Sequence, residues 1–518
     1  MKSMLTKSVL SGFLLALSWP VNGFPILIFI AFVPLLHLTF ISPPKNKLVL
    51  LSLIYLTFLI WNGTTTWWLW NATAFGMLFA VLVNSLLMTS VFVIALFVDK
   101  KLPRKISLAF LVSLWLSFEW LHLQWDFSWP WLQLGNVFSE QIYWIQWYEY
   151  TGVFGGSLWV WVINLIVFKG IQHSKRRLNR LFALTALGIS TPIIISLVIY
   201  HQYNIENTQT LHVMVTQPNV DPYDEKYSFT DAEQCTALFN LINTATKPTD
   251  LIIAPETYFS EGPGSHIDHF DKSPLFHQIS NELQNHNAAQ LLTGIQFYNT
   301  YTNKNKTETA NKINTNMWAD FYNSSFLSSN EEIQVYHKSK LVVGVETLPY
   351  RDLIEPIMGN FMIDLGGTVL SRATQPKRVA MTLDSGIKVG PVICYESVYG
   401  AFVTEYVREG AQFLAVMTND AWWGNTPGHK QLLSYTRLRA IETRRPIARS
   451  ANTGISAFIN PFGEIEQTLD YETKGFLEGE VRPQNKLTYY VRSGDFIARL
   501  ALGISGFLFL FAIARKKT

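Results

Sequence analysis

The segment Gly390-Pro-Val-Ile-Cys394-Tyr395-Glu396-Ser397 carries the strongest indication of the fold. Its apolar residues predict a buried strand over Lys388–Ile393, and a helical pattern, Val398–Arg408, follows the cysteine. A strand that leads through a turn into a helix is typical of α/β proteins. A thiol at a helix N-terminus is biased towards the thiolate by the helix dipole. Because cysteine is also often a small buried hydrophobe, Cys394 keeps a structural reading beside the catalytic one.

The region around this segment, residues 209–490, alternates apolar runs with amphipathic stretches. This alternation favours an α/β domain over an all-β receptor domain. The segment Asn299–Asn316 is rich in Asn, Thr and Lys and is expected to be a mobile surface loop. The expected strands are Leu211–Thr216, Leu251–Ala254, Leu291–Gln296, Lys388–Ile393 and Phe413–Thr418, and the expected helices are Thr230–Thr244 and Leu432–Thr443.

Two more predicted strands lead into charged residues. Glu256 follows an apolar run and Pro255, at the end of a strand where α/β sheets place their sites. A solvated loop acid or a helix cap would show the same pattern. Lys338 and Lys340 fall on one face of an extended segment, as lysines on an exposed edge strand also do.

Glu256, Lys338 and Cys394 together could perform covalent acyl transfer. The acid would take the thiol proton, the thiolate would attack a carbonyl, and the ammonium would stabilise the oxyanion. We expect the three strands that carry them to belong to one sheet. The second cysteine, Cys235, lies within a predicted helix and is expected to be structural, and two cysteines cannot form a disulfide framework or a cysteine-rich zinc site.

The first 200 residues have a membrane-like composition. They hold 13 Lys and Arg and 5 Asp and Glu, whereas the other 318 residues hold 28 and 33. This contrast excludes a wholly soluble enzyme, a disordered protein and a basic nucleic-acid binder. The opening run resembles a signal peptide, but the next run follows without a cleavage site, which favours a retained helix. Candidate spans lie at about 6–22, 24–41, 48–69, 74–98, 106–125, 150–168, 181–200 and 494–514.

The positions of the cations predict the topology. All 13 Lys and Arg of residues 1–200 precede the first span or lie in alternate loops, on one side of the membrane. Both termini are therefore expected in the cytoplasm. We expect a seven-span membrane domain over 1–200, an extracytoplasmic catalytic domain over 209–490 and an eighth span over 494–514.

Aromatic and acidic residues add detail to the membrane region. Glu119 lies within a predicted span, where an acid can be functional or can bond to a neighbouring helix. A secondary transporter would often show a repeat between its two halves and a pair of broken helices. We find neither feature in this sequence. Fourteen of the 17 tryptophans precede residue 200, and an interfacial belt is expected from Trp67, Trp68, Trp70, Trp125, Trp129 and Trp131.

The order Glu256, Lys338, Cys394 resembles the Glu-Lys-Cys triad of the nitrilase (carbon–nitrogen hydrolase) superfamily, whose domain is an αββα sandwich. The eight spans and the segment Trp129-Pro-Trp-Leu-Gln-Leu-Gly135 resemble the apolipoprotein N-acyltransferase family within it. That family moves a fatty acyl chain from a phospholipid to the N-terminal amine of a diacylglyceryl-cysteine, the last step of lipoprotein maturation. Further similar motifs are Thr418-Asn-Asp-Ala-Trp422-Trp423-Gly424, Arg437-Leu-Arg439-Ala-Ile-Glu442-Thr-Arg-Arg445-Pro and Arg449-Ser-Ala-Asn452-Thr-Gly454-Ile-Ser.

The resemblance implies a role for each site residue. Cys394 is the nucleophile that forms a thioester, Glu256 the general base and Lys338 the oxyanion partner. Lys338 is preferred to Lys340 because of its eight-residue spacing to a second acid, Glu346. Tyr395 and Glu396 match the residues after the nucleophile, and the residues implied in substrate binding are Tyr227, Trp422, Trp423, Phe361 and Met362.

The resemblance implies no cofactor, no metal and no nucleic acid, and we expect a monomer in the inner membrane. Its partners are a phospholipid acyl donor, a diacylglyceryl-modified apolipoprotein acceptor and membrane lipids. A two-chain lipid leaves the bilayer at a cost of about 0.8 kcal/mol per CH2, so the site must come to the membrane. The apolar run over 345–365 is a candidate lid, although a helix packed on the domain would look similar.

Two alternatives remain open at this point. One is a membrane-anchored amidase or nitrilase that uses water as acceptor. The other is a receptor or transporter with a periplasmic binding domain.

Overall fold

The computed structural model describes residues 2–171, 175–221, 228–245, 248–286, 290–328, 333–350 and 371–515. The chain divides into two compact units. Unit 1 comprises Met1–Trp70, Ala74–Tyr203 and Ser493–Thr518, and unit 2 comprises Asn71–Thr73 and Asn204–Arg492.

Unit 1 is helical. Among the described residues, six of the helices are long and apolar enough to cross a membrane: α4, α6, α7, α9, α17 and, within α10, Leu181–Gln202. The helices of this part of the chain are α1 (Lys2–Leu17), α2 (Ile28–Ala31), α3 (Val33–Phe40), α4 (Lys47–Thr66), α5 (Leu69–Ala72), α6 (Ala74–Asp99), α7 (Arg104–Gln124), α8 (Tyr148–Thr151), α9 (Val153–Ile171), α10 (Lys175–Gln202) and α17 (Phe496–Ala514).

The first two predicted spans are helical but short. Helix α1 has 16 residues, so it is about 24 Å long, less than the roughly 30 Å of a bilayer core. The second span is divided into a 3-10 turn at Pro25–Leu27 and the helices α2 and α3. The predicted count of eight spans is therefore not confirmed, whereas the other six predicted spans each coincide with a helix of spanning length.

Aromatic rings fill the interior of unit 1. Trp115 lies at the centre, with its ring centroid 5.4 Å from that of Trp161 and 5.7 Å from that of Phe58. Trp68 and Trp131 are also fully buried, with ring centroids 4.9 Å apart, so assigning these two to an interfacial belt was wrong. They pack against each other because paired indole rings bury more apolar area than a surface position allows.

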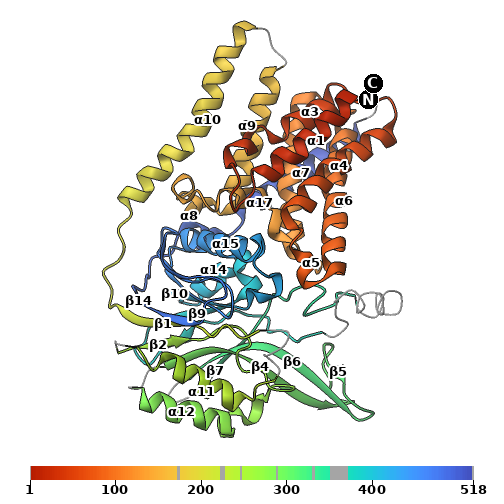
Figure 1. Cartoon of the computed structure of the whole chain (residues 1–518). Helices are drawn as coiled ribbons and strands as arrows, with labels where there is room; N and C mark the ends of the chain where they lie inside the picture. The colour runs from red at the N-terminus through yellow and green to blue at the C-terminus, as the bar shows by residue number, and fades with distance from the viewer. Residues whose placement is uncertain are drawn as a thin grey trace. The chain divides into compact units, whose positions relative to one another are not determined.

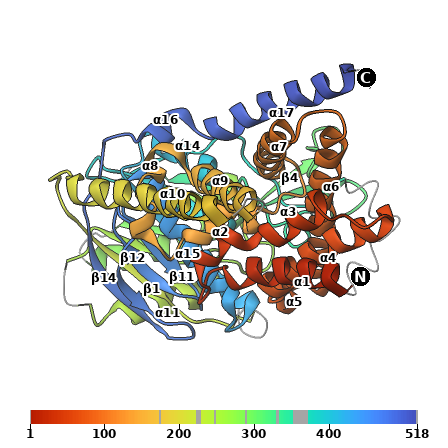
Figure 2. The ribbon, with the colours of Figure 1, turned by 90° about the horizontal axis from the view of Figure 1, so that it is seen from above.

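Two contacts tie distant parts of unit 1 together. The last helix, α17, packs along α7 (Figure 2), and the hydroxyls of Ser117 and Ser505 lie 3.0 Å apart between them. Glu119 on α7 is buried, and its Oε1 accepts hydrogen bonds from the Trp115 indole and the Leu134 backbone, each at 2.9 Å. The hydrogen-bonding reading of Glu119 therefore has direct structural support.

Unit 2 contains two β-sheets. The first sheet has the order β14-β1-β2-β4-β6-β5, with β3 paired to β4 and β7 paired to β6, and the second has the order β13-β12-β11-β10-β9-β8. The strands are β1 (Leu211–Gln217), β2 (Leu251–Ile253), β3 (Ser265–His266), β4 (Gln290–Thr302), β5 (Asn311–Lys312), β6 (Met317–Leu327), β7 (Gln334–His337), β8 (Met381–Thr382), β9 (Lys388–Ile393), β10 (Phe413–Thr418), β11 (Ile447–Ala451), β12 (Ser456–Ile459), β13 (Ile465–Leu469) and β14 (Gly475–Val481).

Helices cover the outer faces of both sheets. In Figure 1, α11 (Asp231–Ile242) and α12 (Pro274–Asn285) lie on the first sheet, and α14 (Gly400–Arg408) and α15 (Pro427–Thr443) lie on the second. A short helix, α16 (Tyr489–Ser493), closes the unit. The four layers confirm the predicted αββα sandwich.

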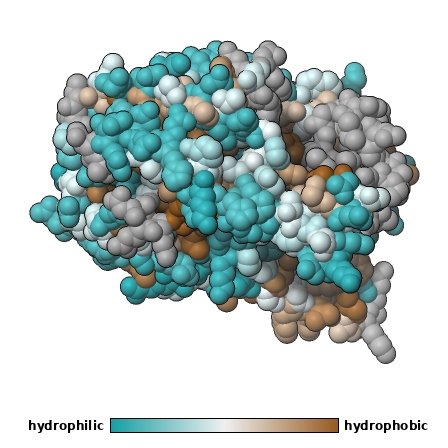
Figure 3. Space-filling model, turned by 90° about the horizontal axis from the view of Figure 1, so that it is seen from below, coloured by the Kyte–Doolittle hydropathy of each residue, from teal (hydrophilic) through white to brown (hydrophobic). Residues whose placement is uncertain are grey.

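Amphipathic patterns explain how these layers form. On α12, Leu275, Ile279 and Leu283 recur every four residues and enter the core beneath the first sheet. The outward face that carries α11 and α12 is mainly hydrophilic (Figure 3). Between the sheets, the Ser450 hydroxyl donates to the Thr216 carbonyl at 2.7 Å, so the inner faces are also joined by hydrogen bonds.

The predicted bounds of β9 and β10 match the structure, but the expected loop Asn299–Asn316 is partly strand. β4 continues to Thr302, which pairs with Met317 of β6, and β5 adds a further short strand. The prediction was wrong because it weighed only the polar composition. Backbone pairing with β6 holds these polar residues in a strand that is solvated on its outer part.

Candidate active site

A buried ammonium lies at the centre of the candidate site. Glu256 follows β2 and Lys338 follows β7, and Lys338 Nζ lies 2.8 Å from Glu256 Oε1 and 2.9 Å from Glu346 Oε2. The residue Lys338 is 1% exposed and Glu256 is 7% exposed. The surface readings of these two residues are therefore wrong, because buried charges persist only when they are paired.

Asn323, in the middle of β6, joins the two acids and was missed in the sequence. Its side-chain amide donates to Glu256 Oε1 and to Glu346 Oε1, each at 2.8 Å. The backbone N–H of Asn419 donates to the other oxygen, Glu256 Oε2, at 3.1 Å. The one available signal was a polar residue in a strand that is otherwise largely buried.

The pairing controls the charge of the site. Burial by itself would lower the pKa of Lys338, but Glu256 and Glu346 outweigh it and raise that pKa well above its ordinary value. Burial would raise the pKa of Glu346, but Lys338 and then Arg372 lower it. Lys338 therefore remains an ammonium, and two of its three N–H bonds are committed to carboxylates.

Cys394 follows β9 and occupies a strained turn. Its φ is +50°, in the left-handed region that a residue with a Cβ adopts at a cost of about 1–3 kcal/mol. Cys394 opens a 3-10 segment, Cys394–Val398, and the α-helix α14 begins only at Gly400. The expectation of a thiol at an α-helix N-terminus was wrong, because the Glu396 side chain accepts the Ile393 N–H and folds the chain into a tight turn.

The thiol is also less acidic than expected. Burial raises the pKa of Cys394 above its ordinary value and the charge of Glu256 raises it further, whereas Lys338 opposes both. A desolvated site disfavours an isolated thiolate. These surroundings favour the neutral thiol of Cys394 over the thiolate.

The three residues come from two sheets rather than one. β2 and β7 belong to the first sheet and β9 belongs to the second. The expectation of one sheet was wrong because strand order in the chain does not reveal which sheet a strand joins. Cys394 nevertheless lies within electrostatic range of both Glu256 and Lys338.

Glu396 fastens the two sheets together at the site. Its Oε1 accepts from the Tyr336 hydroxyl at 2.6 Å and from the Ser339 N–H at 2.7 Å, next to Lys338. Its Oε2 accepts from the Ile393 N–H at 2.9 Å, next to Cys394. Burial raises the pKa of Glu396, while these donors oppose that rise. This carboxyl group therefore links the segment that carries Lys338 to the segment that carries Cys394.

The other sequence-predicted residues have different surroundings. Tyr395 is buried, with its ring edge-on to Tyr399, and the Lys340 ammonium lies 5.1 Å from the centroid of that Tyr399 ring. Trp422 and Trp423 are half-buried in a 3-10 turn after β10. Cys235 is fully buried in the α11 core, as expected. Tyr227, Phe361 and Met362, with the candidate lid from residue 351 onward, lie outside the described residues.

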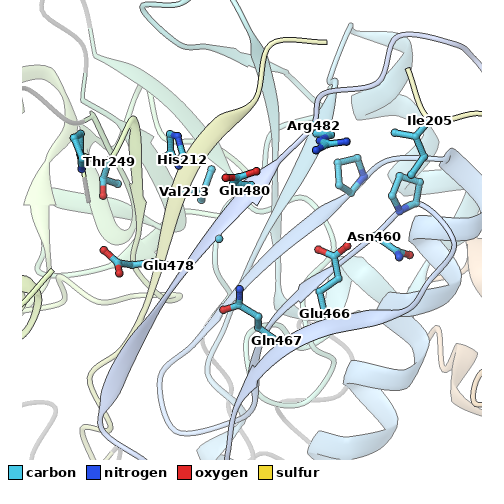
Figure 4. Close-up of a pocket in the computed structure, with 14 residues that line it drawn as sticks. Ile205, His212, Val213, Thr249, Asn460, Glu466, Gln467, Glu478, Glu480 and Arg482 are labelled. Carbon is cyan, nitrogen blue, oxygen red and sulfur yellow. The ribbon is translucent and has the colours of Figure 1, made fainter. Parts of the chain in front are cut away.

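Unit 2 has a small cavity at the candidate site and a larger pocket away from the predicted site residues. A small cavity beside Glu256 is lined by that residue, Asn419 and Asn452, among others. A larger pocket of about 490 Å³ is lined by none of the predicted site residues. Figure 4 shows that its carboxylates come from Glu466, Glu478 and Glu480.

Comparisons with known proteins cover nearly the whole chain. Residues 206–486 match the family model described as carbon-nitrogen hydrolase, and residues 11–166 match that described as apolipoprotein N-acyltransferase N-terminal domain. A protein of Chlorobaculum tepidum named apolipoprotein N-acyltransferase is 28% identical, over 98% of this chain and 96% of the relative. One of the same name from Geobacter metallireducens is 26% identical, over 98% and 95%. Among solved structures, an amidase of the nitrilase superfamily from Nesterenkonia AN1 is 12% identical, over 58% of this chain and 100% of that chain, with a TM-score of 0.38.

Replacing Glu346 by Gln tests the electrostatic account of the site. Because the pKa of Glu346 is lowered, its charge contributes stability above the unfolded-state pKa of about 4.3, and that stability is lost as the pH falls through the lower folded pKa. Glu346→Gln should cost about 3 kcal/mol at pH 7, since it breaks a buried pair, and should flatten the loss of stability in acid. Thermal unfolding in detergent between pH 3 and 8 measures both effects.

Glu405→Gln is the matched control, since Glu405 forms a partly exposed pair with Arg378 at 2.7 Å. That variant should lose less than about 1 kcal/mol. Equal losses in the two variants would contradict the account.

Proposed function

The chain belongs to the carbon–nitrogen hydrolase family and is an acyltransferase of its membrane-bound branch, and from this premise we propose its substrates and chemical steps. It is an integral inner membrane protein that acts in lipoprotein maturation. The donor we propose is a membrane phospholipid, and the acceptor is the N-terminal amine of a diacylglyceryl-modified apolipoprotein. The observation that carries the proposal is a buried Glu–Lys–Cys site in a chain with six helices of spanning length among its described residues.

The first half-reaction forms an acyl-enzyme. Glu256 takes the Cys394 proton as the sulfur attacks an ester carbonyl of the phospholipid, since a buried thiol is not ionised beforehand. The third N–H of Lys338 stabilises the oxyanion, while the other two hold the acids. The C–O bond then breaks, the lysophospholipid oxygen takes the proton from Glu256, and a thioester remains on Cys394.

The second half-reaction transfers the acyl chain. The acceptor amine attacks the thioester carbonyl, Glu256 takes a proton from the nitrogen, and Lys338 again stabilises the oxyanion. The C–S bond breaks and the thiolate recovers the proton from Glu256. The amide product and the free thiol complete a ping-pong cycle without a cofactor.

The lipid nature of both substrates motivates further assignments. We assign Tyr227, Trp422 and Trp423 to substrate binding, and Phe361 and Met362 to a lid that contacts the outer leaflet. Glu346 supports the lysine, and Tyr395 and Glu396 support the nucleophile. The enzyme is proposed to act as a monomer.

The topology follows from the cations. We propose seven spans in residues 1–200, a catalytic domain over 209–490 on the periplasmic side, and an eighth span over 494–514. Both termini then lie in the cytoplasm, and the acyl donor comes from the outer leaflet.

The first test is the mass of the enzyme after incubation with phospholipid alone. Cys394 should gain one acyl group, which hydroxylamine should remove, because a thioester is labile to that nucleophile. Cys394→Ala should show no gain, and Cys235→Ala, which alters the buried cysteine of α11, should gain as the wild type does. A gain that persists in Cys394→Ala would refute the assignment, and release of free fatty acid in place of N-acylation would identify a hydrolase.

The second test separates the two lysines. Glu256→Gln and Lys338→Ala should each slow acyl-enzyme formation by about 10²–10⁴-fold, because each removes a group that acts in the transition state. Lys340→Ala is the control and should retain activity, since the assigned ion pairs with Glu256 and Glu346 are made by Lys338, whereas the Lys340 ammonium lies 5.1 Å from the centroid of the Tyr399 ring. Single-turnover rates with a labelled phospholipid give the comparison. The reverse order of the two lysine variants would overturn the assignment of Lys338.

The third test concerns the side of the membrane. Alkaline phosphatase, which is active only outside the cytoplasm, should be active when fused after residue 205 and inactive when fused after residue 175. The reason is that Lys169 and Lys175, which a fusion after residue 175 retains, lie in a loop that the distribution of cations assigns to the cytoplasmic side. The opposite pattern would place the catalytic unit in the cytoplasm.

A further inference from the structure

Thr418, the last residue of β10, lies beside the nucleophile and is fully buried. β10 runs parallel to β9, with Met417 opposite Ile393, so Thr418 comes next to Cys394 where both strands end. Burial is the main cause that raises the pKa of the Cys394 thiol, and the neighbouring Thr418 side chain acts in the opposite direction. The Thr418 hydroxyl has no role in the catalytic steps proposed above.

The Thr418 hydroxyl is hydrogen-bonded to a buried ion pair formed by Asp420 and Arg449. The Thr418 hydroxyl donates to Asp420 Oδ1 at 2.5 Å, and Arg449 Nη2 donates to Asp420 Oδ2 at 2.6 Å. The Arg449 guanidinium also donates from Nε to the Ile455 carbonyl at 3.1 Å. Asp420 and Arg449 are both completely buried. The hydroxyl is therefore held by a buried, hydrogen-bonded ion pair.

The backbone at Gly454 passes close to the Asp420 carboxylate. A Cβ on Gly454 would lie 2.3 Å from Asp420 Oδ2, so the position requires glycine for close approach and not for its φ. A buried ion pair rarely adds net stability compared with apolar residues of the same size. A role in positioning the Cys394 thiol would explain why the Asp420–Arg449 ion pair is buried at this place.

We propose that Thr418 is a positioning residue for Cys394, with Asp420 and Arg449 as its anchor. At rest, the O–H of Thr418 donates to Asp420. When Glu256 removes the thiol proton, the same O–H turns to the sulfur and donates to the thiolate. One hydrogen bond is exchanged for another, and no covalent bond of Thr418 changes.

The charged groups around the sulfur make this hydrogen bond useful. Glu256 and Asp420 both oppose the thiolate, and Lys338 favours it. Arg449 is paired with Asp420 and so offsets part of its charge. His429 also faces Asp420, but burial lowers its pKa to about 4, so it is neutral at pH 7 and adds no charge. Among these neighbours, Thr418 can be altered without changing the charge of the site.

The experiment is alkylation of Cys394 by iodoacetamide in the full-length protein in detergent, with Cys235→Ala as the background. Thr418→Val removes the hydroxyl and keeps the volume, so alkylation should slow by roughly ten- to a hundredfold at each pH, and its pH profile should move upward. Thr418→Ser restores the hydroxyl and should restore both the rate and the profile. A purely structural role would change the unfolding temperature and leave the pH profile in place.

A second variant covers the case in which valine disturbs folding. Thr418→Ala leaves the space beside Asp420 open and should slow alkylation as much as Thr418→Val. Wild-type rates and an unchanged profile in either folded variant would overturn the proposal, as would failure of Thr418→Ser to restore them. The role assigned to Thr418 rests on Cys394 acting as nucleophile in the proposed function. The alkylation assay uses no lipid, so an enzyme that alkylates as expected but gains no acyl group would refute the proposed donor and leave Thr418 in its role.

Discussion

The ammonium of Lys338 is the group on which the site depends, because a buried charge requires partners that are held in place. Its partners, Glu256 and Glu346, come from other segments of unit 2 and are joined by Asn323 of β6. The cluster can exist only when β2, β6 and β7 are assembled in one sheet. The same pairing keeps Lys338 charged, as the oxyanion role proposed for it requires.

The second sheet carries the thiol, because Cys394 lies in a strained turn directly after β9. Glu396 ties that turn to the segment around Ser339, so one buried carboxyl group links the segment of the thiol to that of the lysine. Desolvation keeps the thiol protonated until the base acts. In the proposed function, the thiol is activated when Glu256 takes its proton during the attack.

Much of this organisation was predictable from local pattern. The bounds of β9 and β10 follow from short apolar runs between polar turns, and the resemblance to the carbon–nitrogen hydrolases is confirmed by the family model over residues 206–486. Local pattern gave wrong predictions where residue composition alone was used and the partner of a segment was not known. The polar end of β4 is a strand because β6 lies beside it, and Trp68 and Trp131 are core residues because each covers the other.

The sequence by itself determined the two-part architecture, the α/β class and the chain order of acid, lysine and cysteine, because hydropathy, period and motif order are properties of neighbouring residues. The αββα arrangement was implied by the resemblance to the nitrilase superfamily. Only the tertiary structure decided that the lysine and the cysteine stand on different sheets, that Asn323 joins the acids, and that burial raises the pKa of the thiol. Burial, pKa and cross-sheet hydrogen bonds depend on groups far apart in the chain. No local pattern encodes which distant carboxylate will face a given ammonium once the sheets have packed.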